Sequence, residues 1–280
     1  MATVQWFPGH MKKAERMMLD NIKLVDAVCE IVDARIPYSS RNPDLDEIIA
    51  GRKPRLVILN RADQADPSVT ALWREFYRQN GVAFMECDAR SGRGVKDFSA
   101  KLRELTGKTG PLRAMVAGVP NVGKSTFINK VSGRKAAATS DRPGVTRGKQ
   151  WVFVDDKLEL LDTPGILWPR FDDPAVGERL AYTGAVKDLV FDVEDLAARL
   201  LVLLREFYPQ AVTERYKIEL DPDAMPWELL EACARKRGFL MARGEVNTER
   251  MANILLDEFR GGMLGRISLE RPDQSLGTAK

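Results

Sequence analysis

One short segment of this chain restricts its fold more than any other. Gly118-x-x-x-x-Gly123-Lys124-Ser125 follows the apolar run Leu112–Val119 and precedes the helical run Ser125–Val131. Glycines let a backbone wrap around phosphate groups, and the amides of such a loop point inward at the start of a helix. The pattern alone occurs by chance, but its position between a strand and a helix argues against an ordinary loop. The sequence therefore predicts an α/β domain with a phosphate site at the end of one strand.

The expected roles within this loop follow from its side chains. Lys124 carries a positive charge to the β- and γ-phosphates and is a candidate catalytic residue, while the Ser125 hydroxyl is a candidate ligand of Mg²⁺. Nucleotide contacts are expected from the whole turn, which comprises Asn121, Val122, Gly123, Lys124, Ser125 and Thr126.

A second motif, Asp162-Thr-Pro-Gly165, begins at the end of another apolar run, thirty-seven residues after Ser125. There we expect Asp162 to hold Mg²⁺ and the Gly165 amide to meet the γ-phosphate of the nucleotide. Thr146 lies between the two motifs. It is the candidate switch threonine, a catalytic residue that ligates the metal only when the γ-phosphate is present. The alternative for Thr146 is an ordinary loop residue, although its position favours the switch role.

A guanine-reading motif, Asn60-Arg61-Ala62-Asp63, follows the apolar run Arg55–Leu59. The Asp63 carboxylate can accept the N1 and N2 hydrogens of guanine, a donor pair that adenine lacks, so GTP and GDP are the expected ligands. Arg61 stands where this motif usually has Lys. Because a guanidinium can also lie along the base, we expect guanine specificity to survive.

A weaker motif, Asp88-Ala89, follows the strand expected over Val82–Cys87 and is similar to the last guanine-binding motif of GTPases. The Ala89 amide is expected to face O6 of guanine, and Asp88 stands where Ser is more usual. Both guanine motifs precede the phosphate loop, whereas GTPases usually place them after it. The chain thus contains the parts of a GTPase in rotated order.

The remaining pattern predicts a doubly wound, mostly parallel α/β sheet followed by a small all-helical domain. Strands are expected over 27–33, 55–59, 82–87, 112–119, 150–154 and 157–161, and helices over 10–25, 43–51, 67–80 and 95–105. After Pro169 only helices are expected, over 193–208, 226–237 and 247–260, with Pro209 between the first two. We therefore predict a permuted GTPase domain with an N-terminal helix over 1–174, a helical domain that docks RNA or the ribosome over 175–271, and a flexible tail over 272–280.

Charge is unevenly distributed along the chain, although its net value is only +3. Residues 90–150 contain fourteen Lys and Arg against three Asp and Glu, more than one nucleotide requires. This excess predicts a surface for a polyanion such as nucleic acid, and a solvated basic surface is the alternative. The basic residues concerned include Arg134, Lys135, Arg142, Arg147 and Lys149.

These motifs resemble those of the circularly permuted GTPases of the YlqF type. The resemblance runs from residue 5 to about residue 270. Besides the order of the motifs, it rests on Trp6-Phe-Pro-Gly-His10, Val32-Asp-Ala-Arg-Ile-Pro37, Ser40-Arg-Asn-Pro43 and Asp162-Thr-Pro-Gly-Ile-Leu-Trp-Pro169. It implies a GTP-hydrolysing factor in late assembly of the large (50S) ribosomal subunit. The implied partners are the subunit precursor and ribosomal RNA, with stimulation by the ribosomal particle.

The resemblance also assigns roles to two single residues. Ile166 stands where many GTPases have a water-orienting Gln, and the family comparison implies that His10, the single histidine, takes that catalytic task. The alternative for His10 is packing or helix capping. Asn121 matches the asparagine that ligates a monovalent cation in related GTPases, which implies a K⁺ ion beside the phosphates. The alternative for Asn121 is a solvent-facing loop residue.

Two other functional classes remain open on the sequence alone. The first is a GTP-regulated RNA-binding scaffold with negligible turnover, which the missing Gln favours. The second is a GTPase acting on tRNA or at a membrane. No apolar stretch reaches the length of a membrane span, so no membrane partner is expected, and no DNA partner either. Three cysteines without metal-ligand spacing favour a reduced, cytoplasmic protein.

Overall fold

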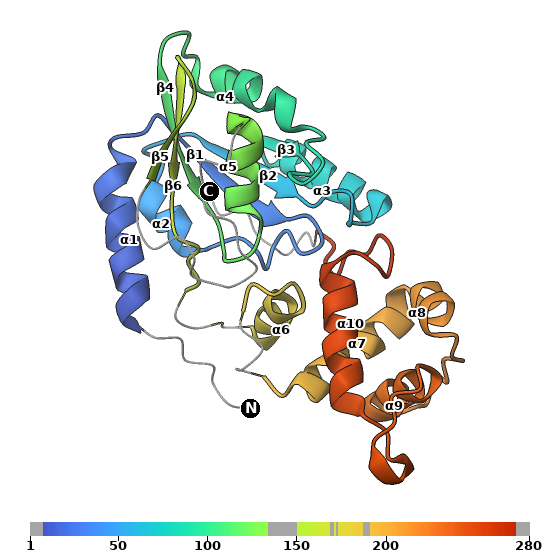
Figure 1. Cartoon of the computed structure of the whole chain (residues 1–280). Helices are drawn as coiled ribbons and strands as arrows, with labels where there is room; N and C mark the ends of the chain where they lie inside the picture. The colour runs from blue at the N-terminus through green and yellow to red at the C-terminus, as the bar shows by residue number, and fades with distance from the viewer. Residues whose placement is uncertain (1–7, 134–149, 169–170, 172, 187–190, 273–280) are drawn as a thin grey trace. The chain divides into compact units, whose positions relative to one another are not determined.

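The computed structural model describes residues 8–133, 150–168, 171, 173–186 and 191–272, with the side chains of 8–14 and 243 excepted. Contacts divide the chain into two compact units (Figure 1). The first comprises Met1–Asp173 and Glu270–Lys280, and the second comprises Pro174–Leu269. Thr146 and the five basic residues between 134 and 149 lie outside the described residues, as does the side chain of His10.

The first unit contains a six-stranded sheet in the order β3-β2-β1-β4-β6-β5. All neighbouring strands are parallel except β5, which pairs antiparallel with β6. The strands are β1 (Ala27–Asp33), β2 (Arg55–Asn60), β3 (Phe84–Glu86), β4 (Leu112–Ala117), β5 (Gln150–Asp155) and β6 (Leu158–Asp162). Because β4 lies between β1 and β6, the half of the chain with the guanine motifs and the half with the phosphate motifs form one sheet.

Helices cover this sheet on both sides, and α1 and α5 lie on opposite sides of β4, β5 and β6 in Figure 1. The helices of this unit are α1 (Pro8–Ile22), α2 (Asp44–Ile49), α3 (Pro67–Gln79), α4 (Phe98–Thr106) and α5 (Lys124–Ser132), with a 3₁₀ turn η1 (Val95–Asp97) before α4. One buried cluster joins α1 and α2 to β1, β4 and β6 through residues such as Met18, Leu45 and Met115. A second joins α3 to β1 and β2 through Trp73, Tyr77 and Val57. The predicted α/β fold class is confirmed.

The second unit is helical. It comprises α6 (Pro174–Tyr182), α7 (Val193–Phe207), α8 (Pro209–Tyr216), α9 (Pro226–Lys236), the 3₁₀ turn η3 (Ala242–Gly244) and α10 (Thr248–Arg260). Between Pro174 and Leu269, the described residues pair as β-structure only at the isolated bridge Leu240–Val246. The sequence pattern did not predict helices α6 and α8. Pro209 was expected to separate two helices, but it opens α8 at the first helical position, where a proline loses no hydrogen bond.

The Glu258 carboxylate links three elements of this unit by accepting hydrogen bonds from Tyr216, Arg215 and Arg237. Throughout the described residues, no helix combines the length and the apolar character that a membrane crossing requires. The three cysteines are free and buried, and burial raises the pKa of the Cys87 and Cys233 thiols to about 12.

After the helical unit, the chain returns to the first unit at Glu270. The buried Glu270 carboxylate accepts hydrogen bonds from the Tyr38 amide at 2.8 Å, from the Ser39 amide and from the Ser39 hydroxyl. Its main-chain oxygen accepts one from the Trp73 indole at 3.1 Å. The helical unit is therefore bracketed by two segments that belong to the first unit.

Glu270→Gln is expected to lower the free energy of unfolding of the first unit by about 1.5–3 kcal/mol, because a charged acceptor becomes an amide whose NH₂ group faces other donors. Urea unfolding checks this. Trp73→Phe is the comparison: it keeps a ring in the core, removes the hydrogen bond to the Glu270 carbonyl oxygen and leaves part of the indole volume unfilled, so the expected loss exceeds the ~1 kcal/mol of that hydrogen bond alone. An unchanged unfolding midpoint in Glu270→Gln would contradict the stabilising role of the contacts that the Glu270 carboxylate makes with Tyr38 and Ser39.

Candidate nucleotide-binding site

The phosphate loop joins β4 to α5 and can be built only with glycine at two positions. Gly118 has φ +147°, and a Cβ there would lie 2.4 Å from the Ile31 carbonyl oxygen. Gly123 has φ +98°, and a Cβ there would lie 2.3 Å from Nδ2 of Asn60. The phosphate loop thus packs directly against β1 and against the first guanine motif. It leads directly into the start of α5.

Lys124 is buried in the first turn of α5. Its Nζ donates to the carbonyl oxygens of Gly118 at 3.0 Å and Val119 at 2.8 Å. Burial lowers the pKa of this lysine to about 8, and the Asp162 carboxylate partly opposes that shift. The ammonium is therefore held against the loop in a place where charge is disfavoured, and a phosphate anion would stabilise it.

Nucleotide affinity is expected to fall as pH rises above about 8. Below that pH Lys124 is already protonated, and above it the free protein must take up a proton when phosphates raise the lysine pKa. The affinity for GDP should therefore fall by up to about tenfold per pH unit. Titration with a fluorescent GDP analogue between pH 7 and 9 measures this, and Lys124→Arg, which stays charged, should remove the dependence. Equal slopes in both proteins would contradict the linkage.

Asp162 and Gly165 are brought to the phosphate loop by β6, whose residue Asp162 pairs with Val116 in β4. The Asp162 side chain is buried. A Cβ on Gly165 would lie 2.8 Å from the Pro120 nitrogen and 2.9 Å from Nζ of Lys124, so the backbone of Gly165 touches the loop. The fold thus brings Asp162 and Gly165 to the phosphate loop, and their contacts with Mg²⁺ and the γ-phosphate stay predictions.

Ile166 has a structural role that its position alone did not indicate. It is buried at 4% exposure in the cluster beneath α1 and α2. Its carbonyl oxygen accepts a 3.4 Å hydrogen bond from Nδ2 of Asn42. A side chain turned into the core cannot orient an attacking water molecule, so that group must come from elsewhere.

Asn60 holds three loops together at the end of β2. Its Nδ2 donates to the carbonyl oxygen of Val122 in the phosphate loop at 2.7 Å. Its Oδ1 accepts from the Ala89 amide at 3.0 Å and from the Cys87 thiol at 3.5 Å. A single amide side chain therefore connects the phosphate loop, the first guanine motif and the segment that follows β3.

The rest of the first guanine motif lies next to the phosphate loop. Arg61 has a left-handed backbone, with φ +61°, and donates from a terminal nitrogen to the Asn121 carbonyl oxygen at 2.8 Å. The Ala62 amide donates to the Cys87 carbonyl oxygen at 3.1 Å. The Asp63 side chain is exposed. This arrangement leaves the Asp63 carboxylate open to a base.

The second guanine motif is tied to the first. The Ala89 amide donates to Oδ1 of Asn60 at 3.0 Å, and its contact with O6 of guanine stays a prediction. Asp88 accepts hydrogen bonds from the Arg90 amide at 2.8 Å and the Ser91 amide at 3.2 Å. Burial raises the pKa of Asp88, but these hydrogen bonds outweigh it and hold that pKa below its usual value. Asp88 therefore has a local role: it fixes the turn after β3.

A buried ion pair that the motifs did not indicate lies beside this site. Asp33, at the end of β1, accepts from Nε of Arg35 at 2.9 Å and from a terminal nitrogen at 2.8 Å. Both side chains are at most 3% exposed. The sequence could have indicated a role for Asp33, because polar residues at the carboxyl end of a buried parallel strand lie at the edge where such sheets bind ligands.

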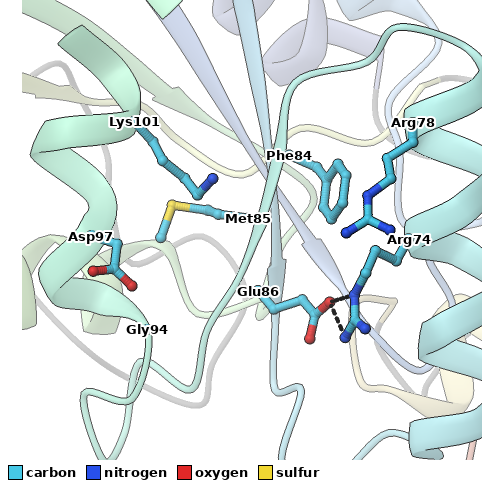
Figure 2. Close-up of a pocket in the computed structure, with 8 residues that line it drawn as sticks. All are labelled: Arg74, Arg78, Phe84, Met85, Glu86, Gly94, Asp97 and Lys101. Atoms are coloured by element: carbon cyan, nitrogen blue, oxygen red, sulfur yellow. Dashed lines mark hydrogen bonds and ion pairs between the residues drawn. The ribbon is translucent and has the colours of Figure 1, made fainter. Parts of the chain in front are cut away.

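A separate pocket of about 370 Å³ lies beside the edge strand β3 (Figure 2). Arg74 and Arg78 from α3 lie on one side of the strand, and Asp97 and Lys101 lie on the other. On the side of α3, Arg74 and Glu86 form an ion pair at 2.9 Å. None of the predicted nucleotide-binding residues lines this pocket, so it is not the nucleotide site.

Comparison with known proteins gives a consistent result. A family model described as "50S ribosome-binding GTPase" matches residues 113–220. The chain is 44% identical over 285 residues to Ribosome biogenesis GTPase A of Priestia megaterium, covering 98% of each chain. It is 34% identical over 296 residues to Mitochondrial ribosome-associated GTPase 1 of Mus musculus, covering 95% of this chain and 90% of the mouse protein. The solved structure of GNP-bound YlqF from T. maritima matches with a TM-score of 0.68 at 30% identity, covering 93% of this chain and 99% of that one.

Proposed function

The chain belongs to the ribosome biogenesis GTPase A, or YlqF, family of circularly permuted GTPases, and on that basis we propose that it acts late in assembly of the large (50S) ribosomal subunit. It is a GTP-binding and GTP-hydrolysing protein of ribosome biogenesis, as the motifs predict. This favours turnover over the alternative of a scaffold with negligible hydrolysis. The proposed refinement is that the ribosomal particle stimulates hydrolysis.

One observation carries the proposed stimulation. The nucleotide motifs converge on one site, yet the residue after Gly165 is packed in the core and cannot position water. A free protein built this way should hydrolyse GTP slowly. The missing group must then be added by another part of the chain, for which His10 is our candidate, or by the particle itself.

We propose the large-subunit precursor and its ribosomal RNA as the partners. We accordingly propose that the protein acts in the cytoplasm, and we expect no DNA partner and no membrane partner. Exposed basic side chains beside the second guanine motif and at the end of α5 support an RNA contact: Arg90, Arg93, Lys96 and Lys130. We assign docking to the helical region, which the sequence places at 175–271, as well as to this surface.

We propose Mg²⁺ as the metal of the site. The Ser125 hydroxyl and the buried Asp162 carboxylate are hard oxygen donors, which suit Mg²⁺, and this ion usually binds few protein ligands together with phosphates and water. Thr146 would complete the set in the GTP-bound state. When bound, the ion neutralises charge on the β- and γ-phosphates.

GTP hydrolysis is expected to be faster in K⁺ than in Na⁺ at equal ionic strength. Asn121 is the proposed K⁺ ligand, and it lies in the phosphate loop with a left-handed backbone, φ +58°. A cation there would stabilise charge that develops on the phosphates. Turnover in the two salts measures the effect, and Asn121→Ala should remove the difference. Equal rates for the unmodified protein, alone and with ribosomal particles, would reject the cation.

Turnover with and without large-subunit precursors tests the proposed function directly. Sedimentation on sucrose gradients should show the protein on the precursor with a non-hydrolysable GTP analogue and released with GDP. The precursor should raise GTP turnover, and His10→Ala should reduce the stimulated rate about 10²–10⁴-fold while leaving nucleotide affinity intact. Unaltered stimulated turnover would clear His10 of catalysis, and absence of co-sedimentation in both nucleotide states would reject the partner.

A further inference from the structure

The carboxylate of Asp33 lies between two guanidinium groups at the edge of the nucleotide site. Oδ2 of Asp33 is 2.8 Å from a terminal nitrogen of Arg35 and 3.8 Å from Nε of Arg61. Arg35 and Asp33 are almost completely buried, whereas Arg61 is 24% exposed. One negative charge therefore serves two positive charges, of which only Arg61 belongs to a nucleotide motif.

Strand pairing fixes Asp33 in this place. Asp33 in β1 is the register partner of Asn60 in β2, and the Ala34 amide donates to the Asn60 carbonyl oxygen at 2.9 Å. The Asp33 amide donates to the Ser40 hydroxyl at 2.9 Å, and that hydroxyl donates to the Ile36 carbonyl oxygen at 2.6 Å. The Asp33 carboxylate is therefore attached to a rigid end of the sheet, directly beside the first guanine motif.

Arg61 uses this position to hold the phosphate loop. Its guanidinium bonds the Asn121 carbonyl oxygen at 2.8 Å, and the preceding residue Asn60 bonds the next carbonyl oxygen, that of Val122, at 2.7 Å. Two neighbouring residues of the guanine motif thus bind two consecutive carbonyl groups of the phosphate loop. These two hydrogen bonds hold the guanine-reading loop and the phosphate loop together, so that the two loops are expected to move together.

The charges around Arg61 show what keeps it there. Burial lowers the pKa of Arg61, and the nearby Arg35 and Arg90 act in the same direction. Asp33 and, to a smaller extent, Asp63 raise it, so Asp33 is the larger of the two opposing charges. Without the negative charge of Asp33, two cations would repel each other at this edge. Arg61 could then relieve the repulsion by turning into solvent, away from the Asn121 carbonyl group.

We infer that Asp33 is a positioning residue of the nucleotide site, whose carboxylate, shared with Arg35, holds Arg61 on the Asn121 carbonyl group and so couples the guanine-reading loop to the phosphate loop. Asp33 touches no reacting atom. Its effect is on how long bound nucleotide stays, because a coupled pair of loops must open together to release it. The inference deepens the guanine-nucleotide binding of this family and does not depend on the ribosomal partner.

A double-mutant cycle on nucleotide dissociation tests this inference. In Asp33→Asn, a fluorescent GDP analogue should dissociate on the order of tenfold faster, with little change in its association rate. Arg61→Gln should give a similar increase. The double variant should be no faster than Arg61→Gln alone, because Asp33 acts through Arg61. Additive effects would overturn the inference.

The matched control is Glu30→Gln. Glu30 lies on the same strand, is also buried, and is also shared by two arginines, at 3.2 Å from Arg55 and 3.7 Å from Arg41. It contacts neither nucleotide loop in the described structure. Glu30→Gln should lower the unfolding midpoint while leaving GDP dissociation unchanged, which separates loss of a buried ion pair from loss of loop coupling. Equal acceleration in Glu30→Gln and Asp33→Asn would overturn the inference.

A second variant keeps the test valid should Asp33→Asn not fold, since it leaves the buried Arg35 without its carboxylate. Asp33→Asn combined with Arg35→Gln replaces the ion pair by two neutral amides, which avoids an uncompensated buried charge. This variant removes both the carboxylate that attracts Arg61 and the Arg35 cation that would repel it, so only the loss of attraction remains. We expect GDP to dissociate faster than from the unmodified protein but less fast than from Asp33→Asn, with no further increase when Arg61→Gln is added. Unchanged dissociation would reject the role of Asp33.

Discussion

Lys124→Ala is expected to lower the rate of GTP hydrolysis at saturating nucleotide by on the order of 10²–10³-fold, the loss typical when one group that stabilises transition-state charge is removed. Nζ of Lys124 is buried beneath the phosphate loop and bonds the Gly118 and Val119 carbonyl groups. Phosphates can replace these neutral acceptors with negative ones, and the gain is greatest where negative charge builds up. Single-turnover hydrolysis, measured beside GTP and GDP affinities, gives the size of the effect.

Ser125→Ala is the comparison that separates charge from metal binding. If Ser125 ligates Mg²⁺, the defect of Ser125→Ala should shrink as the Mg²⁺ concentration rises, while that of Lys124→Ala should not. Both residues lie in the first turn of α5, so a general distortion of that turn would affect the two variants alike. Rescue of both by excess Mg²⁺, or of neither, would contradict their separate roles.

The sequence predicted most of the fold of the first unit because its strands are buried and its helices carry clear end signals. All seven residues of β1 are buried, and its apolar residues on either side of Glu30 mark it as an interior strand. Helix α3 begins at Asp66 and Pro67, a side-chain cap followed by a first-turn proline. The sequence could not show that Glu270 returns to the first unit, because its partners lie 231 and 232 residues earlier.

The site was predictable at the level of motifs and not at the level of contacts. The motifs indicated that Lys124 and Asp162 lie near each other, since Lys124 opens the helix after β4 and Asp162 ends the neighbouring parallel strand β6. It did not reveal that the Ala89 amide is taken by Asn60, because which donor an amide oxygen selects depends on distances between three loops. Nor did it assign Asp33, whose importance depends on the arginine that the fold brings beside it.

Asp63→Asn is expected to weaken GTP binding by on the order of 100-fold, or about 2–3 kcal/mol, and to shift preference towards XTP. The carboxylate accepts hydrogens from both N1 and N2 of guanine, whereas an amide offers one oxygen and places its NH₂ group against a donor. Xanthine has an oxygen where guanine has the N2 amino group, so the same NH₂ group gains an acceptor. Competition of a labelled GTP analogue by GTP, ATP and XTP measures this preference.

Asn60→Ala gives the contrast that makes the Asp63 result specific. Asn60 connects three loops through the Val122 carbonyl oxygen, the Ala89 amide and the Cys87 thiol, so its loss is expected to loosen all three. Affinity for GTP, GDP and XTP should then fall together, with their ratios preserved. Because Asp63 is exposed, Asp63→Asn should leave the unfolding midpoint unchanged, whereas Asn60→Ala should lower it. A change in the GTP-to-XTP ratio in Asn60→Ala, or an unchanged ratio in Asp63→Asn, would mean that guanine is read by other residues than Asp63.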